Sequence, residues 1–482
     1  MISSSVVPRQ QPSDFPLVVD LDGTLIKTDL LYESFFDALS RRHIAVFNWD
    51  LSKRLTRNGL KRHLLSYCDI DHGTLPYNED VLRIIEEARS AGRKVYLATA
   101  SDRFHAERVA ESLQLFDGVF ASDDQVNLKG EMKAQALVEA FGEGGFDYIG
   151  NDASDKAIWR HARKAYGVHM SAAVARDLAA THPDHVAVHR DQGRWGALIT
   201  AMRPHQYAKN CLIFVPLLTA HQFNLESLFS AVLAFIAFSL CASGVYLLND
   251  LLDIQADRGH PTKRLRPFAS GALPIPIGMA FIPILTLAAF GIAWLISFNF
   301  FVTLLAYYVI TNAYSFVIKR RMIIDVVTLA CLYTIRIFAG AAAIDVAVSD
   351  WLFTFSLLIF TALALLKRYI ELAGLLDRQL SDPSNRNYRV ADLPVIMALA
   401  AAAGMNSVMV IALYVSSDAV ASLYTHPRIL WGLCPLFLYW IAGAIMLAHR
   451  RLMDDDPIAF ALKDNRSWAV GFIAVSLVLA AL

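Results

Sequence analysis

The chain has few cysteines and no net charge, and both absences narrow its class. None of its five cysteines shows the spacing of a metal site, so we expect buried, small apolar residues. Lysine and arginine (44) balance aspartate and glutamate (44), which favours neither nucleic acid nor an acidic partner. Residues 1–16 lack the apolar core of a signal peptide, so we expect a cytosolic amino-terminal half with residues 1–13 disordered.

Long apolar runs dominate the chain after about residue 200. Hydrophobic residues make up 55% of the 482 residues, and the mean hydropathy is +0.40. A helix needs about 20 apolar residues to span a bilayer. Nine segments meet or approach this length, which predicts an all-α integral membrane bundle: 207–222, 226–248, 276–296, 298–317, 322–344, 351–372, 392–415, 428–449 and 467–482.

The basic residues predict the orientation of this bundle. With nine crossings that start in the cytosol, the outer loops hold almost no basic residues, Arg428 excepted. The cytosolic loops hold many, which satisfies the positive-inside rule. We therefore expect a multi-pass protein of the inner (cytoplasmic) membrane with its active sites on the cytosolic side. The basic residues of those loops are Arg258, Lys263, Arg264, Arg266, Lys319, Arg320, Arg321, Lys367, Arg368, Arg378, Arg386, Arg389, Arg450, Arg451, Lys463 and Arg466.

An acidic cluster follows the second apolar run. Asn249, Asp250, Asp253 and Asp257 recur at steps of three and four, so a helix would present them on one face. Two unit charges about 4 Å apart interact by roughly 4 kcal/mol at a surface-like dielectric, so the cluster needs cations. Oxygen ligands suit Mg²⁺, and the basic run from Lys263 to Arg266 suits phosphates. A solvated, charge-rich helix end is the alternative.

The first half of the chain predicts an α/β domain. Residues 16–19 form an apolar strand that ends at Asp20 and Asp22. A second strand, residues 94–101, ends in Thr99 and Ser101, and a third, residues 147–155, ends in acids. Strands that alternate with helices indicate a doubly wound, Rossmann-like sheet, whose carboxyl edge binds ligands.

The Asp-x-Asp-Gly-Thr run from Asp20 to Thr24 resembles the signature of the haloacid-dehalogenase-like phosphatases, over about residues 14–170. By this resemblance Asp20 is the nucleophile and Asp22 the general acid/base. Thr99, or alternatively Ser101, would hold phosphoryl oxygens together with Lys133. Asp155 and Asp20 would bind Mg²⁺, and residues 28–90 would form a helical cap.

Two positions depart from this pattern or leave it open. The residue after Gly150 is Asn151, whereas the family commonly has aspartate there. The nearest acidic residue is Asp152, one position later. Lys129 competes with Lys133 for the lysine role. A domain that keeps the fold without the activity is the alternative.

Residues 171–200 are polar and irregular, which predicts a linker. Its end, Arg194 to Met202, is amphipathic enough to lie at the membrane surface. Arg203 and Lys209 follow, and either lipid headgroups or a phosphate would suit them. Residues 201–482 would then form the transmembrane domain.

This transmembrane part resembles the UbiA superfamily of membrane prenyltransferases. The resemblance is carried by residues 203–210, 249–257 and 260–267, and more narrowly it points to the polyprenyl-phosphate phosphoribosyltransferase branch. Aromatic prenyltransferases usually carry a second pair of aspartates four residues apart. Here Leu329 stands four residues after Asp325, where the second aspartate would be. A second full metal-binding cluster is therefore missing.

The branch implies 5-phosphoribosyl 1-diphosphate and a polyprenyl phosphate as partners, with Mg²⁺ as cofactor. Asp253 and Asp257 would be catalytic through the metal, and basic residues would stabilise the leaving pyrophosphate. Arg336 lies within an apolar segment, where a charge is costly, so we predict a functional role for it. The full set of expected substrate-binding residues is Thr99, Lys133, Arg203, Lys209, Lys263, Arg266, Lys319, Asp325, Arg336, Lys367 and Arg368.

Together, the two halves predict a multidomain, bifunctional enzyme that transfers 5-phosphoribose and then removes its 5-phosphate. Two alternatives stay open: an aromatic prenyltransferase fused to a phosphatase of unrelated substrate, and a non-catalytic binding module in place of the phosphatase. The sequence leaves the oligomeric state and the lipid length undefined.

Overall fold

The computed structural model describes residues 15–41, 64, 67–123, 126–188, 193–379, 387–453 and 457–482. They form two compact units, residues 1–202 with 247–281 and residues 203–246 with 282–482. We expected a single domain over 201–482. Residues 247–281, which carry the acidic cluster, pack with the amino-terminal unit instead. The segment expected to be disordered, 1–13, lies outside the described residues.

The first unit contains a parallel sheet of six strands in the order β3-β2-β1-β4-β5-β6. The chain adds strands on one side of β1 and then on the other, so β1 and β4 flank the point where the strand order reverses. Ligands bind at such a point in open α/β sheets. The strands are β1 (Leu17–Val19), β2 (Val95–Asp102), β3 (Gly118–Ser122), β4 (Asp147–Gly150), β5 (Lys164–Val168) and β6 (Val186–Val188).

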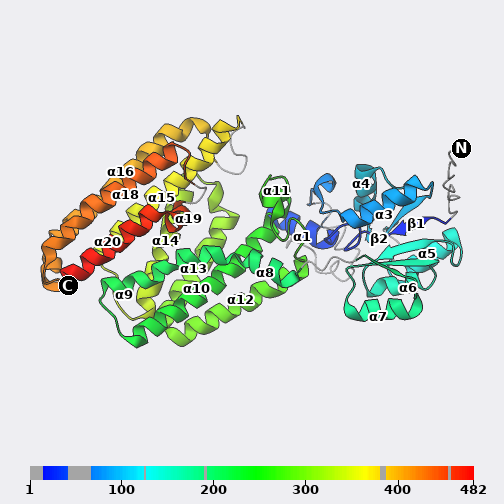
Figure 1. Ribbon diagram of the computed structural model, residues 1–482, viewed down its shortest axis with the longest axis horizontal. Helices are drawn as coiled ribbons and strands as arrows, with labels where there is room; N and C mark the ends of the chain where they lie inside the picture. Colours follow the sequence, from blue (N-terminus) through cyan, green and yellow to red (C-terminus); the bar gives the residue numbers. More distant parts are fainter. Residues whose placement is uncertain are drawn as a thin grey trace, which may run out of the picture. The chain divides into compact units, whose positions relative to one another are not determined.

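Helices cover both faces of this sheet (Figure 1). Leu17 and Val19 point to one face and Val18 to the other, as the strand alternation requires. The first face packs against α3 (Glu79–Ser90) and α4 (Arg103–Leu113), and the second against α5 (Glu131–Phe141), α6 (Lys156–Trp159) and α7 (Ala172–Thr181). This confirms the Rossmann-like α/β fold.

The structure corrects two expected boundaries in this unit. Residues 172–188 form α7 and β6, and β6 pairs with β5, so the sheet continues into the predicted linker. The predicted cap over 28–90 lies partly outside the described residues, and its end, α3, packs under the sheet through Val81 and Ile85. The described part of this segment also contains α1 (Leu30–Arg41) and a short 3₁₀ turn, η2 (His72–Thr74). The amphipathic segment is helical, as α8 (Arg194–Met202).

A pair of histidines, the half-buried His72 and the buried His105, links η2 to α4. His105 Nδ1 lies 2.9 Å from His72 Nε2, and its Nε2 lies 3.1 Å from Ser34 Oγ. Burial, with a smaller effect of His72, lowers the pKa of His105 to about 3. Unfolding restores an ordinary value near 6.5, so between pH 6.5 and 3 the unfolded chain binds the extra proton.

The free energy of unfolding should therefore fall as the pH drops below 6.5, by up to about 1.4 kcal/mol per pH unit from this group. We expect His105→Gln to reduce the pH dependence of the thermal unfolding midpoint of the purified protein between pH 7 and 5. His161, whose side chain is 36% exposed, provides the control variant His161→Gln. Equal slopes for wild type and His105→Gln would contradict the prediction.

Six helices are long and apolar enough to cross a membrane, within Leu225–Leu252, Ile275–Ile296, Ile324–Ala343, Asp350–Asp377, Val390–Val415 and Pro427–His449. They confirm six of the nine predicted segments in the described part of the chain. The helices α13 (Phe298–Phe316) and α20 (Asn465–Ala481) fall outside this set. The segment 207–222 is not one α-helix. It is a 3₁₀ helix, η4 (Pro204–Phe214), followed by α9 (Val215–Thr219), and each has a proline among its first two residues.

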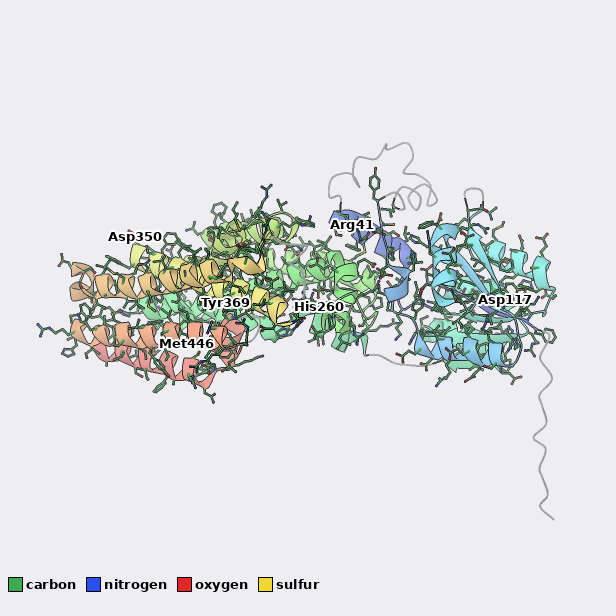
Figure 2. The ribbon with its side chains drawn as sticks, turned by 90° about the horizontal axis from the view of Figure 1, so that it is seen from above. Arg41, Asp117, His260, Asp350, Tyr369 and Met446 are labelled. Carbon is green, nitrogen blue, oxygen red and sulfur yellow. The ribbon has the colours of Figure 1, made fainter. Side chains whose placement is uncertain are left out.

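Helix α14 (Ile324–Ala343) lies between two apolar clusters of the second unit. One is formed with α10 (Leu225–Leu252), α12 (Ile275–Ile296) and α13, through residues such as Phe238 and Phe300. The other is formed with α15 (Asp350–Asp377), α16 (Leu393–Val415) and α18 (Leu433–His449). Figure 2 labels Tyr369 of α15. Its OH lies 3.1 Å from Nδ1 of His449 in α18.

The small residues of α14 allow close packing. A Cβ on Gly340 would lie 2.0 Å from the carbonyl oxygen of Ile213 in η4. Large apolar side chains point outward instead: Leu287 and Leu295 of α12 are 71% and 83% exposed. Small residues between helices and apolar residues outside are typical of an integral membrane protein. The remaining elements are α11 (Ile254–Arg258), η5 (Lys263–Leu265), η6 (Ile318–Arg320), η7 (Val390–Asp392), α17 (Asp418–Leu423), η8 (Pro427–Gly432) and α19 (Pro457–Lys463).

Candidate active site

A buried carboxylate–lysine centre lies where β1 ends. Asp20 is 7% exposed, and its Oδ1 accepts a 2.7 Å hydrogen bond from Nζ of Lys133, a residue of α5. Lys133 Nζ also lies 3.7 Å from Asp155 Oδ1, and Tyr148 OH is 2.9 Å from Nζ and 2.8 Å from Asp155. The alternative, Lys129, is exposed. Asp20 and Asp155, which the sequence predicted at the same site, therefore both lie at Lys133.

Burial acts against charge at this centre. It raises the pKa of Asp20 to about 7, and Lys133 opposes the shift. Burial alone would lower the pKa of Lys133, yet Asp20 and Asp155 raise it above its usual value. The 2.7 Å contact favours the charged pair. A carboxylate held ionised in a dry site is a suitable nucleophile.

Asp22 is fixed beside this centre by three donors. The backbone N–H of Leu30 donates to its Oδ1 at 2.9 Å, and Ser101 and Thr99 donate to Oδ2 at 2.6 and 3.3 Å. Ser101 lines the cavity over the site, whereas Thr99 is fully buried and accepts from the Ser101 N–H. The sequence prediction favoured Thr99 for contact with phosphoryl oxygens, but Ser101 is the one at the cavity surface.

The departure at Asn151 has a structural counterpart. Gly23 has φ +76°, and a Cβ there would lie 2.2 Å from Asn151 Nδ2, so Asn151 packs onto the turn that directly follows Asp22. Asp155 remains at the centre, because the N–H groups of Asn151 and Asp152 donate to its Oδ2 at 2.8 and 3.1 Å. Asp152 instead caps the 3₁₀ turn η3 (Ala153–Asp155).

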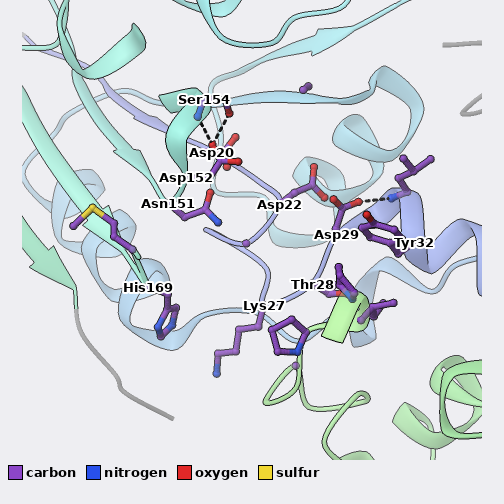
Figure 3. A pocket seen from close by; sticks show the side chains of 18 of the residues that line it. Asp20, Asp22, Lys27, Thr28, Asp29, Tyr32, Asn151, Asp152, Ser154 and His169 are labelled. Carbon is purple, nitrogen blue, oxygen red and sulfur yellow. Dashed lines mark hydrogen bonds between the residues drawn. The ribbon is translucent and has the colours of Figure 1, made fainter. Parts of the chain in front are cut away.

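The cavity over these residues has a volume of about 960 Å³. Figure 3 shows Asp20, Asp22 and Asn151 grouped on one side of it, with Lys27 and His169 apart from them. A phosphate fills only a small part of such a volume, which is at the upper end for a small-molecule site.

The acidic cluster is nearly helical but has a break. Helix α10 ends at Leu252, Asp253 forms a turn, and α11 follows, with i to i+4 hydrogen bonds on both sides of the break. Arg266 Nη1 lies 2.7 Å from Asp257 Oδ2 and 3.3 Å from Asp250 Oδ1. Burial raises the pKa of Asp257, and Arg266 opposes the shift. Two of the predicted metal ligands, Asp250 and Asp257, therefore pair with one arginine.

Both centres fit Mg²⁺ by their chemistry. Each brings two carboxylates to one positive group, and the ligands are oxygen atoms. In the described part of the chain no three acidic, histidine or cysteine side chains gather as a complete metal site. Mg²⁺ commonly binds through one or two carboxylates plus substrate phosphates.

In the second unit, Asp325 pairs with Arg368. Arg368 Nε donates to Asp325 Oδ2 at 2.6 Å, and Tyr388 OH donates to Oδ1 at 2.6 Å. Both charged side chains are at most 1% exposed. Arg368 also donates to Tyr314 OH at 3.0 Å. The sequence predicted both charged residues as substrate-binding, and the structure joins them in one buried ion pair.

Arg336 is enclosed by aromatic rings. Its guanidinium lies 5.2–5.4 Å from the ring centres of Phe238, Tyr307 and Tyr333, and its Nε donates to Asn210 Oδ1 at 3.0 Å. Lys209 lies over the same Tyr333 ring at 5.9 Å. These contacts satisfy the charge of Arg336 within the protein.

The other predicted cations are less enclosed. Arg203 lies over the ring of Tyr246 at 5.1 Å. Lys263 is exposed, while Lys319 and Lys367 are half-buried.

Sequence reasoning missed a second buried ion pair, within the first unit. Glu33 of α1 accepts from Arg258 Nη2 at 2.6 Å and Nη1 at 3.1 Å, from Gln255 at 2.9 Å, and from Thr28 at 2.7 Å. Glu33 and Arg258 are 225 positions apart, and no local pattern connects them. The pair fixes α11, the helix with Asp257, against α1 of the α/β domain.

Comparisons with known proteins identify the family of the membrane part. Residues 211–473 match the UbiA prenyltransferase family. The uncharacterized protein y4nM of Sinorhizobium fredii is 35% identical over 475 residues, 96% of this chain and 90% of that protein. The decaprenyl-phosphate phosphoribosyltransferase of Mycolicibacterium smegmatis is 34% identical over 180 residues, which are 36% of this chain and 57% of that enzyme.

Solved structures resemble each part. A UbiA homologue from Archaeoglobus fulgidus, bound to DMAPP and Mg²⁺, covers 59% of this chain and 98% of its own, with 14% identity and a TM-score of 0.46. A HAD family hydrolase from Salmonella enterica serovar Typhi covers 35% of this chain and 67% of its own, with 16% identity and a TM-score of 0.27.

The protein is thus an integral membrane protein with an α/β domain at its amino-terminal end. The chain belongs to the UbiA prenyltransferase family.

Proposed function

We propose that the chain is a bifunctional membrane enzyme. It transfers 5-phosphoribose from 5-phosphoribosyl 1-diphosphate to a polyprenyl phosphate, and its phosphatase domain then removes the 5-phosphate. The product, polyprenyl-phosphoryl ribose, would serve cell-envelope glycan synthesis at the cytosolic side of the inner membrane. The observation that carries the proposal is that the acidic cluster and the Asp20 centre belong to one compact unit. The similarity to decaprenyl-phosphate phosphoribosyltransferases supports the first step.

In the transfer step, the bond from ribose C1 to pyrophosphate breaks, and a bond from C1 to a lipid phosphate oxygen forms. The lipid phosphate is already ionised, so no strong base is needed. Asn249, Asp250, Asp253 and Asp257 would hold Mg²⁺, which when bound neutralises the leaving pyrophosphate. Arg266, now between two of these carboxylates, would turn to the pyrophosphate once the metal replaces it. Lys263 lies three residues before it and adds charge.

In the second step, Asp20 attacks phosphorus, and the bond to the ribose 5-oxygen breaks as an aspartyl-phosphate forms. Asp22 gives its proton to the leaving oxygen. It then takes a proton from the water that hydrolyses the aspartyl-phosphate, which releases phosphate and restores Asp20. Lys133 and Ser101 would hold the phosphoryl oxygens, and Asp20 and Asp155 would hold Mg²⁺.

A double-label experiment tests this sequence. The purified protein in detergent receives a polyprenyl phosphate and 5-phosphoribosyl 1-diphosphate with ¹⁴C in the ribose and ³²P in the 5-phosphate. We expect ¹⁴C in the lipid phase and ³²P released as inorganic phosphate. Asp257→Asn should remove the ¹⁴C from the lipid, because it removes a metal ligand and leaves Arg266 in excess. If wild type transfers no ¹⁴C to the lipid, the transferase proposal is wrong.

A further inference from the structure

The segment after the acidic cluster is attached to the phosphatase domain at two points. Arg258, which binds Glu33, also donates from Nε to the carbonyl of Ala269 at 3.0 Å. Gly271 lies so close to Lys27 that a Cβ on it would be 2.5 Å from the Lys27 Cβ, and its φ is +73°. Lys27 follows Asp22 by five residues. The segment therefore packs on the loop that carries the catalytic aspartates.

This segment forms part of the phosphatase cavity. Segments 193–195 and 271–276 contribute eight of the residues that line it. We call six of these the outer wall: Arg194, Trp195, Gly271, Ala272, Ile275 and Pro276. Trp195 of α8 is 71% exposed, and its ring packs edge-on against Phe281 of α12, with the ring centres 6.2 Å apart. The floor of the cavity holds Asp20 and Asp22, so a polar reaction centre faces a largely apolar wall.

The outer wall includes the start of a membrane-length helix, α12. Ile275 is the first residue of α12, whose 22 residues have a mean hydropathy of 2.2. When such a helix spans a bilayer, its first residue lies near the headgroups. An exposed tryptophan beside it is typical of this interface. The cavity wall should therefore lie at the level of the membrane surface.

We propose that the outer wall is the specificity element of the phosphatase site. It selects a phosphate monoester whose sugar is linked to a membrane lipid, and it discriminates against the free sugar phosphate. The scissile phosphate lies at Asp20, and the lipid-linked end of the sugar leaves the cavity over Trp195 and Ile275. This inference rests on the proposed phosphatase activity and adds the residues that choose its substrate.

Two substrates with the same scissile bond test the inference. Ribose 5-phosphate and farnesyl-phosphoryl ribose 5-phosphate are given to the full-length protein in detergent micelles, and released phosphate yields kcat/KM for each. We expect wild type to favour the lipid-linked substrate by at least a hundredfold. Trp195→Ala should lower this ratio at least tenfold. Gly271→Ala, which displaces the wall from Lys27, should lower it as well. Trp294→Ala is the matched control: this tryptophan of α12 is 64% exposed and lies outside the cavity lining, so the ratio should stay.

A wild-type ratio near one, or an unchanged ratio in both wall variants, would overturn the inference. Failure of the proposed function has a different signature. In that case neither substrate would release phosphate, or the release would persist in Asp20→Asn.

Discussion

Replacing Asp20 with asparagine is expected to change the product of the protein rather than stop its synthesis. In the double-label assay, the lipid of wild type should carry ¹⁴C with almost no ³²P. The lipid formed by Asp20→Asn should carry both labels in a ratio of one. The reason is that an amide cannot form the aspartyl-phosphate, so loss of this nucleophile should slow dephosphorylation by about 10³-fold or more.

The environment of Asp20 makes asparagine a well-matched substitution. The amide has nearly the same shape and can still accept from Thr24 Oγ1, now 3.0 Å from Asp20 Oδ2. It leaves Lys133 with Asp155 as its remaining carboxylate at 3.7 Å. Total ¹⁴C in the lipid reports the transfer step, which uses other residues. Asp184→Asn changes an exposed carboxylate of the same unit and should behave as wild type. A lipid without ³²P from Asp20→Asn would exclude Asp20 as the nucleophile.

The residues that the sequence singled out for this centre lie close together in the structure because each belongs to a local pattern on a regular element. Strand β1 is a continuous apolar run, and the first polar residue after it, Asp20, reaches the switch point of the sheet. The choice of Lys133 over Lys129 followed from its place in α5, and the structure puts its Nζ 2.7 Å from Asp20. The choice between Thr99 and Ser101 depends on which hydroxyl faces the cavity. Strand alternation alone does not indicate which of the two residues reaches the cavity surface.

The sequence could not predict contacts that join distant segments. Nothing near Glu33 indicates Arg258, and the outer wall joins residues about 80 positions apart. The first expected span, 207–222, was misjudged because hydropathy does not distinguish a 3₁₀ helix broken by proline from an α-helix. The role predicted for Arg336 rested on the cost of a charge within a span. The structure shows how the protein meets that cost, with three aromatic rings and Asn210.

Replacing Arg368 with methionine is expected to destabilise the helical unit strongly. Asp325 would keep Tyr388 as a donor but lose the guanidinium that lies 2.6 Å from its Oδ2, and it is fully buried. Breaking one side of a buried ion pair costs about 3–5 kcal/mol, because the other charge is left uncompensated. This corresponds to a fall of the thermal unfolding midpoint on the order of 10 °C. The matched control is Arg451→Met. Arg451 pairs with Asp377 at the surface, where both are about a third to a half exposed, so its loss should cost less than about 1 kcal/mol.

The double variant Asp325→Leu with Arg368→Met separates a structural role from a substrate role. Removing both charges should recover most of the lost stability, because apolar side chains of similar size tolerate burial well. If Arg368 serves only the ion pair, transfer of ¹⁴C to lipid should recover together with the unfolding midpoint. If Arg368 also binds a substrate phosphate, stability should return while transfer stays at least tenfold lower, with the loss in KM for 5-phosphoribosyl 1-diphosphate or polyprenyl phosphate. The pair of measurements therefore assigns the buried arginine to folding alone or to folding and binding together.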